Sequence, residues 1–232
     1  MKYLKWILTT LTVISSVIML FVLPDIVPVH FDVNGVVDRW GSKYEILILP
    51  ILAIVSMLAF ELFTKWYNKK INDTNYEKEK AEMLSNIKVL NISTVILSFL
   101  FCGLNIPLLY TTYMQTYPEK NLPTVDVVNV VIIIMGIIFI VLGNYMPKAK
   151  NNPYVGFRCS WTLYNDNTWR KSNRFASYGM MIAGLITLIA GIFVKGIASI
   201  IFMMGSLMLV LPVCLVYAYV VYRKEKNLEK TI

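Results

Sequence analysis

Six apolar stretches, each long enough to cross a lipid bilayer, constrain this chain more than any other feature of its sequence. They are 18 to 27 residues long, carry few or no charges, and cover residues 6–23, 44–63, 89–112, 127–146, 175–194 and 196–222. A helix of about 20 apolar residues spans the hydrocarbon core, where every backbone polar group must be bonded within the protein. We therefore expect an all-α membrane protein with six transmembrane helices.

The composition excludes most other classes of protein. Of the 232 residues 57% are hydrophobic and only 16% are charged, whereas soluble domains carry about 25% charged residues. A soluble enzyme, a secreted disulfide scaffold and a disordered tail are therefore excluded. The three cysteines have no metal-ligand spacing. The first apolar stretch has no small-residue cleavage site before Pro24, so we expect a retained helix rather than a signal peptide.

The basic residues predict how the helices are oriented. If the N-terminus is cytoplasmic, 18 of the 22 Lys and Arg residues fall on the cytoplasmic side of the membrane. The four on the outer side are Arg39, Lys43, Lys120 and Lys195. This asymmetry satisfies the positive-inside rule, and we expect both termini to be cytoplasmic. The net charge of +8 therefore reports topology, and no direct contact with nucleic acid is expected.

Local sequence signals predict several helix ends and contacts. Residues 73–88 are typical of a polar helix, capped by Asp73 or Thr74, that continues into the third span. The last two spans meet at Lys195 and Gly196, which predicts a tight helical hairpin. Glu61 lies four residues before Lys65, and this spacing predicts a local ion pair on one helix.

The first outer loop, residues 24–43, is long for a simple connection. Asn34-Gly35 lies between valines and predicts a small β-hairpin with a two-residue type I′ turn. The side chains that we consider for outer-loop recognition are His30, Asp32, Asp38 and Trp40. His30 and the two aspartates could meet across the hairpin. Three interpretations stay open: a hydrogen-bonded turn with Trp40 at the membrane interface, recognition of an outside ligand, and a divalent metal site.

The cytoplasmic loop at residues 147–174 is the most informative segment of the chain. It interleaves aromatic residues with arginine and lysine, a mixture that suits the lipid headgroup layer and also a surface for a partner or ligand. Asn165 or Asp166 is expected to cap a helix that runs into the fifth span. That helix would place Arg170 and Arg174 on one face, four residues apart.

Catalytic motifs are absent from the sequence. It contains no HExxH, no GxSxG and no phosphate-binding glycine loop, and its one histidine lies in the outer loop. We therefore expect no enzymatic activity and no cofactor. An alternative function is a small-molecule transporter or membrane sensor, in which proline-kinked spans and intramembrane asparagines such as Asn105 and Asn129 form a midplane site.

The two loops resemble those of a known family. The inner loop reads Asn152-Pro-Tyr-Val-Gly156-Phe-Arg158, then Trp161-Thr162-Leu163, Trp169 and Asn173-Arg174-Phe175. This pattern is similar to the signature of SdpI-family membrane proteins, a bacterial toxin-immunity group. The outer loop, with Pro28-Val29-His30-Phe31 and Trp40-Gly41-Ser42-Lys43, resembles an uncharacterised domain often found N-terminal to that signature. We divide the chain accordingly into an N-terminal region, 1–112, and an SdpI-like region, 113–232, within one integrated membrane domain.

The resemblance implies a function and a set of site residues. It implies a multi-pass protein of the bacterial cell membrane that protects its producer from a secreted, membrane-active peptide toxin. It also implies signal transduction, in which the toxin-occupied form holds a transcriptional repressor at the membrane. The implied inner-loop binding residues are Asn152, Gly156, Arg158, Trp161, Thr162, Trp169 and Arg174. Two positions depart from the family pattern: Ser160 stands where proline is common, and Asn173 where histidine is frequent.

Overall fold

Six long helices dominate the computed structural model, which describes residues 3–32, 34–72, 76–120, 123, 125–151 and 156–229. The helices are α1 (Leu4–Val22), α2 (Ile48–Asn72), α3 (Glu77–Thr116), α4 (Val127–Tyr145), α5 (Asp166–Phe193) and α6 (Ile197–Glu229). The shorter elements are strands β1 (Ile26–Phe31) and β2 (Val37–Ser42) and the 3-10 turns η1 (Lys43–Leu47), η2 (Pro118–Lys120) and η3 (Met146–Lys148). All six helices are long and apolar enough to cross a membrane. The prediction of a six-helix, multi-pass membrane protein is confirmed.

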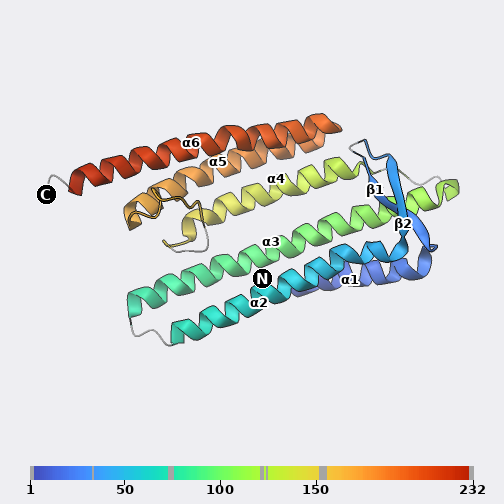
Figure 1. The fold of residues 1–232 in the computed structure, drawn as a ribbon, viewed down its shortest axis with the longest axis horizontal. Helices are drawn as coiled ribbons and strands as arrows, with labels where there is room; N and C mark the ends of the chain where they lie inside the picture. Colours follow the sequence, from blue (N-terminus) through green and yellow to red (C-terminus); the bar gives the residue numbers. More distant parts are fainter. Residues whose placement is uncertain are drawn as a thin grey trace.

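The helices run side by side along the long axis of the molecule (Figure 1). One end, here called the hairpin end, carries β1, β2 and the connections α3–α4 and α5–α6. The opposite end, here called the motif end, carries the α2–α3 connection, the segment from η3 to the start of α5, and the C-terminus of α6. The α5–α6 connection contains only residues 194–196, with Gly196 at a φ of +63°, which confirms the predicted tight hairpin.

Small residues allow α4 and α5 to pack closely. A Cβ atom on Gly136 of α4 would lie 2.6 Å from the backbone nitrogen of Leu188 and 2.9 Å from the carbonyl oxygen of Gly184, both on α5. Lipid provides no hydrophobic force between helices, so close backbone approach is the main source of packing energy there. The other side of α5 packs on α6, where the rings of Phe175 and Tyr217 stack at 4.0 Å between centroids.

The buried face of α1 is polar. Lys5, Thr9, Thr12 and Ser16 form one helical stripe that turns inward, while the apolar residues of α1 face outward. Asn105 of α3 is buried against this stripe. Its Nδ2 donates to the Ser15 hydroxyl at 3.1 Å, and its Oδ1 accepts from the Ser16 hydroxyl at 3.2 Å. Asn105 thus joins α3 to α1 by hydrogen bonds within the bundle.

A second asparagine joins α4 to the end of α5. Asn129 Nδ2 donates to the carbonyl oxygen of Val194 at 2.8 Å. The start of α4 is capped by Asp126, whose carboxylate accepts the backbone N–H of Asn129 at 3.1 Å. Both contacts lie at the hairpin end and hold the α4 start beside the α5–α6 connection.

The ion pair of Glu61 differs from the prediction. Glu61 pairs with Lys5 of α1, not with Lys65 one turn further along α2. Lys65 is exposed, whereas the Lys5 side chain is only 7% exposed. A buried ammonium group is unstable without a nearby anion, whereas an exposed ammonium group is stabilised by water. Pairing with Lys5 therefore stabilises the protein more than pairing with Lys65 would.

Helices α2 and α3 extend together beyond the start of α1. Their contact is apolar: Tyr67 and Ile71 of α2 pack with Met83 and Ile87 of α3. The predicted continuation of the polar helix into the third span is confirmed, because α3 is a single helix of 40 residues. The predicted cap is wrong: the N-cap residue is Tyr76, which makes no side-chain capping bond. Asp73 and Thr74 lie outside the described residues.

Candidate functional site

The hairpin end carries the predicted β-hairpin. Strands β1 and β2 pair antiparallel, but the connection is a five-residue loop and not the two-residue turn that Asn34-Gly35 predicted. The Asp32 carboxylate organises this loop by accepting the backbone N–H groups of Asn34 at 2.9 Å and Val36 at 2.8 Å. Gly35 has the expected positive φ, +76°. The hydrogen bond from Val36, together with those from Asn34, lowers the pKa of Asp32.

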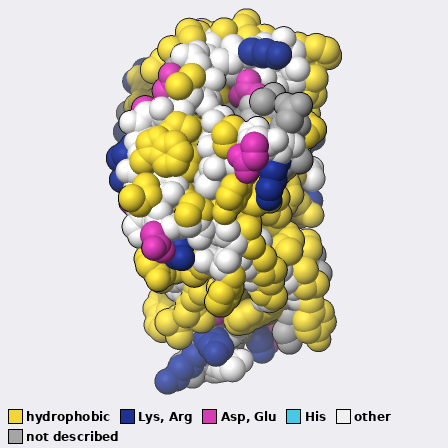
Figure 2. Space-filling model, turned by 90° about the vertical axis from the view of Figure 1, so that its right-hand side faces the viewer, with side chains coloured by type: hydrophobic (Ala, Val, Ile, Leu, Met, Phe, Trp, Pro, Cys, Tyr) yellow, Lys and Arg dark blue, Asp and Glu magenta, His cyan; other side chains and the backbone are white. Residues whose placement is uncertain are grey.

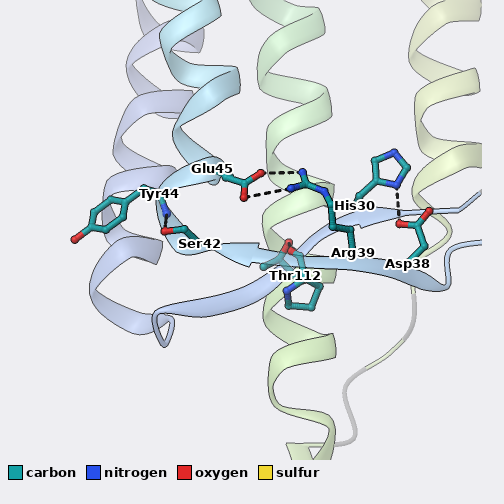
Figure 3. Close-up of polar contacts among 8 residues, drawn as sticks. His30, Asp38, Arg39, Ser42, Tyr44, Glu45 and Thr112 are labelled. Carbon is teal, nitrogen blue, oxygen red and sulfur yellow. Dashed lines mark hydrogen bonds and ion pairs between the residues drawn. The ribbon is translucent and has the colours of Figure 1, made fainter.

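His30 and Asp38 face each other across the hairpin (Figure 3), with 2.6 Å between Nδ1 and Oδ1. Asp32 does not join them, because its carboxylate is used in the loop. The expected meeting of three side chains is therefore right for the His30–Asp38 pair and wrong for Asp32. Within the described part of the chain, no three His, Cys, Asp or Glu residues lie close enough together to hold a metal ion. Trp40 is exposed on β2.

A cavity of about 210 Å³ lies beneath the hairpin, between β1, η1, α2 and α3. Its walls are mainly apolar, and they are formed by Pro28, Val29, Phe31, Ile46, Ile48, Leu49, Leu108 and Leu109. Thr112 holds the hairpin over the cavity by donating to the carbonyl oxygen of Pro28 at 3.2 Å. The volume exceeds the roughly 150 Å³ of an engineered apolar cavity that takes up benzene. One large apolar group can therefore fit.

The charged groups of this cavity come from an ion pair that sequence reasoning missed. Arg39 of β2 reaches toward Glu45 of η1 (Figure 3), with 2.8 Å between Nη2 and Oε2. Both residues also line the cavity. The six-residue separation crosses from a strand into a turn, so neither helical nor strand spacing pointed to the pair. Figure 2 looks onto this end and shows acidic and basic side chains, in places next to each other, among hydrophobic ones.

At the motif end, Trp169 forms the centre of the predicted inner-loop motif. It is 3% exposed, packs with Val89 of α3 and with Ala149, and donates from Nε1 to the carbonyl oxygen of Ala149 at 2.9 Å. Ser85 of α3 donates to the carbonyl oxygen of Lys148 at 2.9 Å. These contacts fix the segment after η3 against both α3 and α5.

Asn173 holds the next part of the loop. Its Oδ1 accepts the backbone N–H of Phe157 at 2.7 Å, and its Nδ2 donates to the carbonyl oxygens of Phe157 at 3.3 Å and Trp169 at 3.2 Å. Gly156 has a φ of +121°, and a Cβ there would lie 2.7 Å from Asn173 Oδ1 and 2.8 Å from the Trp169 ring. The motif glycine is therefore required by backbone conformation and by space.

Two buried threonines complete the loop. Thr162 Oγ1 accepts the backbone N–H of Cys159 at 2.9 Å and donates to the carbonyl oxygen of the same residue at 3.0 Å. Thr168 forms a capping box with Asn165, which confirms Asn165 as the cap of α5. Thr168 Oγ1 also lies 3.2 Å from the carbonyl oxygen of Thr162. The motif thus encodes a compact, hydrogen-bonded turn.

The remaining motif residues lie on the surface. Arg158 and Arg174 are exposed, and Trp161 is half-buried with its ring edge against Tyr219 of α6, 5.1 Å between centroids. Asn152 lies outside the described residues. The structure therefore separates the predicted binding residues into a buried group, with Thr162 and Trp169, and an exposed group.

The C-terminal part of α6 also contacts the loop, which sequence reasoning missed because the partners lie more than 50 residues away. Lys171 pairs with Glu225 at 3.1 Å, and Asn167 donates to the same carboxylate at 2.5 Å. Tyr164 packs edge-on against Tyr222 and donates to Glu229, and this hydrogen bond raises the pKa of Tyr164. The loop is consequently coupled to α6 as well as to α5.

Comparison with known proteins finds a match for the region around each of the two loops. Residues 148–221 match the SdpI/YfhL protein family, and residues 7–54 match a domain of unknown function, DUF1648. The chain is 26% identical over 223 residues to the immunity protein SdpI of Bacillus subtilis (strain 168), an alignment that covers 94% of both chains. No solved structure shows a significant match. The resemblance predicted from the loop motifs is therefore confirmed, and it supports an immunity-protein role.

Proposed function

Because residues 148–221 match the SdpI/YfhL family model, we propose that the chain is an SdpI-family membrane protein that protects its producer from a secreted, membrane-active peptide toxin. The observation that carries the proposal is the alignment with an immunity protein along almost the whole chain. We place the hairpin end outside the cell and the motif end in the cytoplasm. In this orientation 18 of the 22 basic residues of the sequence fall on the cytoplasmic side, in agreement with the positive-inside rule, and this supports the placement.

The hairpin end is the proposed site of toxin recognition. An apolar side chain of the peptide would enter the cavity between the hairpin and α2 and α3, where burial provides binding energy. The exposed pair of His30 and Asp38 and the exposed ring of Trp40 would contact the peptide outside the cavity. The Arg39–Glu45 ion pair would orient the peptide backbone or a charged side chain at the cavity wall.

The motif end is the proposed surface for a cytoplasmic transcriptional repressor. Arg158, Trp161 and Arg174 are the motif side chains that reach the surface, and they are the candidates for direct contact. Gly156, Thr162 and Trp169 would act by holding the loop in shape. Sequestration after toxin binding requires that toxin and repressor both prefer the same arrangement of the helices. Helix α3 reaches both ends, from the cavity at Leu109 to the loop contact at Ser85.

Neither proposed role requires catalysis, and we propose that the protein acts by binding. The alternative function, a small-molecule transporter or sensor, needs an open polar site within the membrane. Asn105 is the best-placed residue for such a site, since it also lines the floor of the hairpin-end cavity. Its amide group, however, is used in hydrogen bonds to Ser15 and Ser16 of α1. Substrate-dependent flux in proteoliposomes would favour the transporter.

A survival assay tests the immunity function. The full chain is expressed in toxin-sensitive cells that are exposed to the peptide toxins encoded near its gene, and viable counts are compared with those of cells carrying an empty vector. We expect protection against at least one toxin. Absence of protection against every such toxin, with the protein present in the membrane, would overturn the immunity proposal.

Matched variants on α2 test the recognition site. Leu49→Trp fills the cavity, whereas Leu52→Trp places the same ring on an exposed position one turn away. We expect Leu49→Trp to abolish protection and Leu52→Trp to retain it. Equal protection by both variants would exclude the cavity as the toxin site. For the motif end, Arg158→Ala with Trp161→Ala should preserve survival and abolish recruitment of the repressor to membranes.

A further inference from the structure

A second hollow lies at the motif end, on the outside of the α4–α5 pair. It has a volume of about 390 Å³ and opens between the end of α4 and the first turns of α5. Asn144, Pro147, Arg170, Arg174 and Tyr178 line it. Arg170 and Arg174 are four residues apart on α5, and both face this hollow, as their spacing predicted.

Among the residues that the structure describes, the two guanidinium groups have neutral partners. Arg170 Nη2 donates to Asn167 Oδ1 at 3.2 Å, and Arg174 Nε donates to the Tyr178 hydroxyl at 3.4 Å. Within the described ranges, neither arginine has a carboxylate within ion-pair distance. Glu82 and Asp166 line the adjoining hollow on the other side of Arg170. Like charges one helical turn apart repel each other, so an anion between the two arginines would be stabilised.

An exposed apolar stripe continues from this hollow along α5. Tyr178, Ile182, Leu185 and Ile189 are each 49% to 57% exposed, and their spacing places them on the same face as Arg174. Because α5 is a membrane-spanning helix, this stripe lies against lipid acyl chains. The arginines stand at the end of the stripe, at the depth of the headgroups.

We propose that the hollow and the stripe together form a groove that binds one anionic phospholipid. The two arginines hold its headgroup phosphate through paired N–H donors, and its acyl chains follow the stripe from Tyr178 to Ile189. Guanidinium groups match the geometry of phosphate oxygens, whereas an ammonium group provides only a point charge. The stripe distinguishes a lipid from a soluble phosphate, since a soluble anion gains nothing from an apolar surface. This inference does not depend on the immunity function, and it assigns Arg174 to the lipid headgroup, which leaves Arg158 and Trp161 for contact with a repressor.

The test measures lipid retained by the purified full chain. Protein in detergent is mixed with phosphatidylglycerol or phosphatidylcholine, and bound lipid is counted by native mass spectrometry. We expect one phosphatidylglycerol per chain and at least a tenfold weaker retention of phosphatidylcholine. The double variant Arg170→Lys/Arg174→Lys keeps both charges but removes the paired donors. We expect it to weaken phosphatidylglycerol retention about tenfold or more, while Arg223→Lys on α6 leaves retention unchanged.

Three results would overturn the proposal. If the double lysine variant retains as much phosphatidylglycerol as the unmodified chain, the lipid is held by diffuse charge attraction and not by paired donors. Equal retention of the two lipids would show that the headgroup charge is not recognised. The third result concerns thermal stability at matched ionic strength. If inorganic phosphate alone stabilises the protein as much as phosphatidylglycerol does, the acyl-chain contact is excluded. If the double variant fails to fold, the single exposed variant Arg174→Lys gives the same comparison.

Discussion

The Lys5–Glu61 ion pair allows a sharp test of the tertiary structure. Glu61→Gln keeps the shape of the side chain and removes its charge. Lys5, whose side chain is 7% exposed, is then left as a buried cation without a counterion. Lys65→Met is the matched control, because helical spacing on α2 predicted Lys65 as the partner of Glu61 and the structure leaves it exposed.

The expected magnitudes follow from burial. Removing one partner of a buried ion pair costs about 3–5 kcal/mol, because the remaining charge is uncompensated. For a chain of this size, this corresponds to a fall of roughly 6–20 °C in melting temperature. Substitution of an exposed lysine usually changes stability by less than about 0.5 kcal/mol. The double variant Lys5→Met/Glu61→Gln removes both charges and should recover most of the loss.

Thermal unfolding of the purified protein in a mild detergent, followed by circular dichroism, provides the measurement. The four proteins of the Lys5 and Glu61 double-mutant cycle are compared with Lys65→Met under the same conditions. A coupling energy near zero between Lys5 and Glu61 would refute the reasoning. A loss of stability in Lys65→Met as large as that in Glu61→Gln would also refute it, because this result would indicate that Glu61 pairs with Lys65.

Three further predictions concern the loops and the helix packing. Asn173→Ala leaves the backbone N–H and C=O of Phe157 unbonded, at about 1–3 kcal/mol for each buried group, so hydrogen exchange at that amide should accelerate tenfold or more. Gly136→Leu should lower the melting temperature by separating α4 from α5, whereas Gly205→Leu, with open space around it, should not. The lowered pKa of Asp32 means that its stabilisation of the hairpin is present above about pH 4 and is lost as the pH falls through the lowered pKa. Asp32→Asn should remove this step from an acid titration of tryptophan fluorescence.

Local sequence patterns predicted the elements of the fold. The six apolar stretches became six helices because hydrophobic length alone decides whether a segment can satisfy its backbone within lipid. The cap at Asn165 was also local, since the cap and its Thr168 partner are three residues apart. The hairpin was predicted from Asn34-Gly35, although its loop type was not, because the Asp32 side chain competes for the same backbone N–H groups.

The candidate site was predicted in its location but not in its division of roles. Trp161 and Trp169 belong to the same motif, yet Trp169 is buried under the loop and Trp161 lies at the surface against α6. Residue type does not separate them, since both rings are large and amphipathic. Only the packing of α3, α5 and α6 decides which ring is covered.

What the sequence by itself determined is the class of this protein: six spans, a small hairpin at one end and a motif loop at the other. Only the tertiary structure decided the partners: Lys5 for Glu61, Arg39 for Glu45, and a groove on α5 for Arg170 and Arg174. The physical reason is the range of the interactions. Spans, caps and turns depend on neighbours a few residues apart, whereas a buried charge selects its counterion from whichever helix the bundle brings beside it.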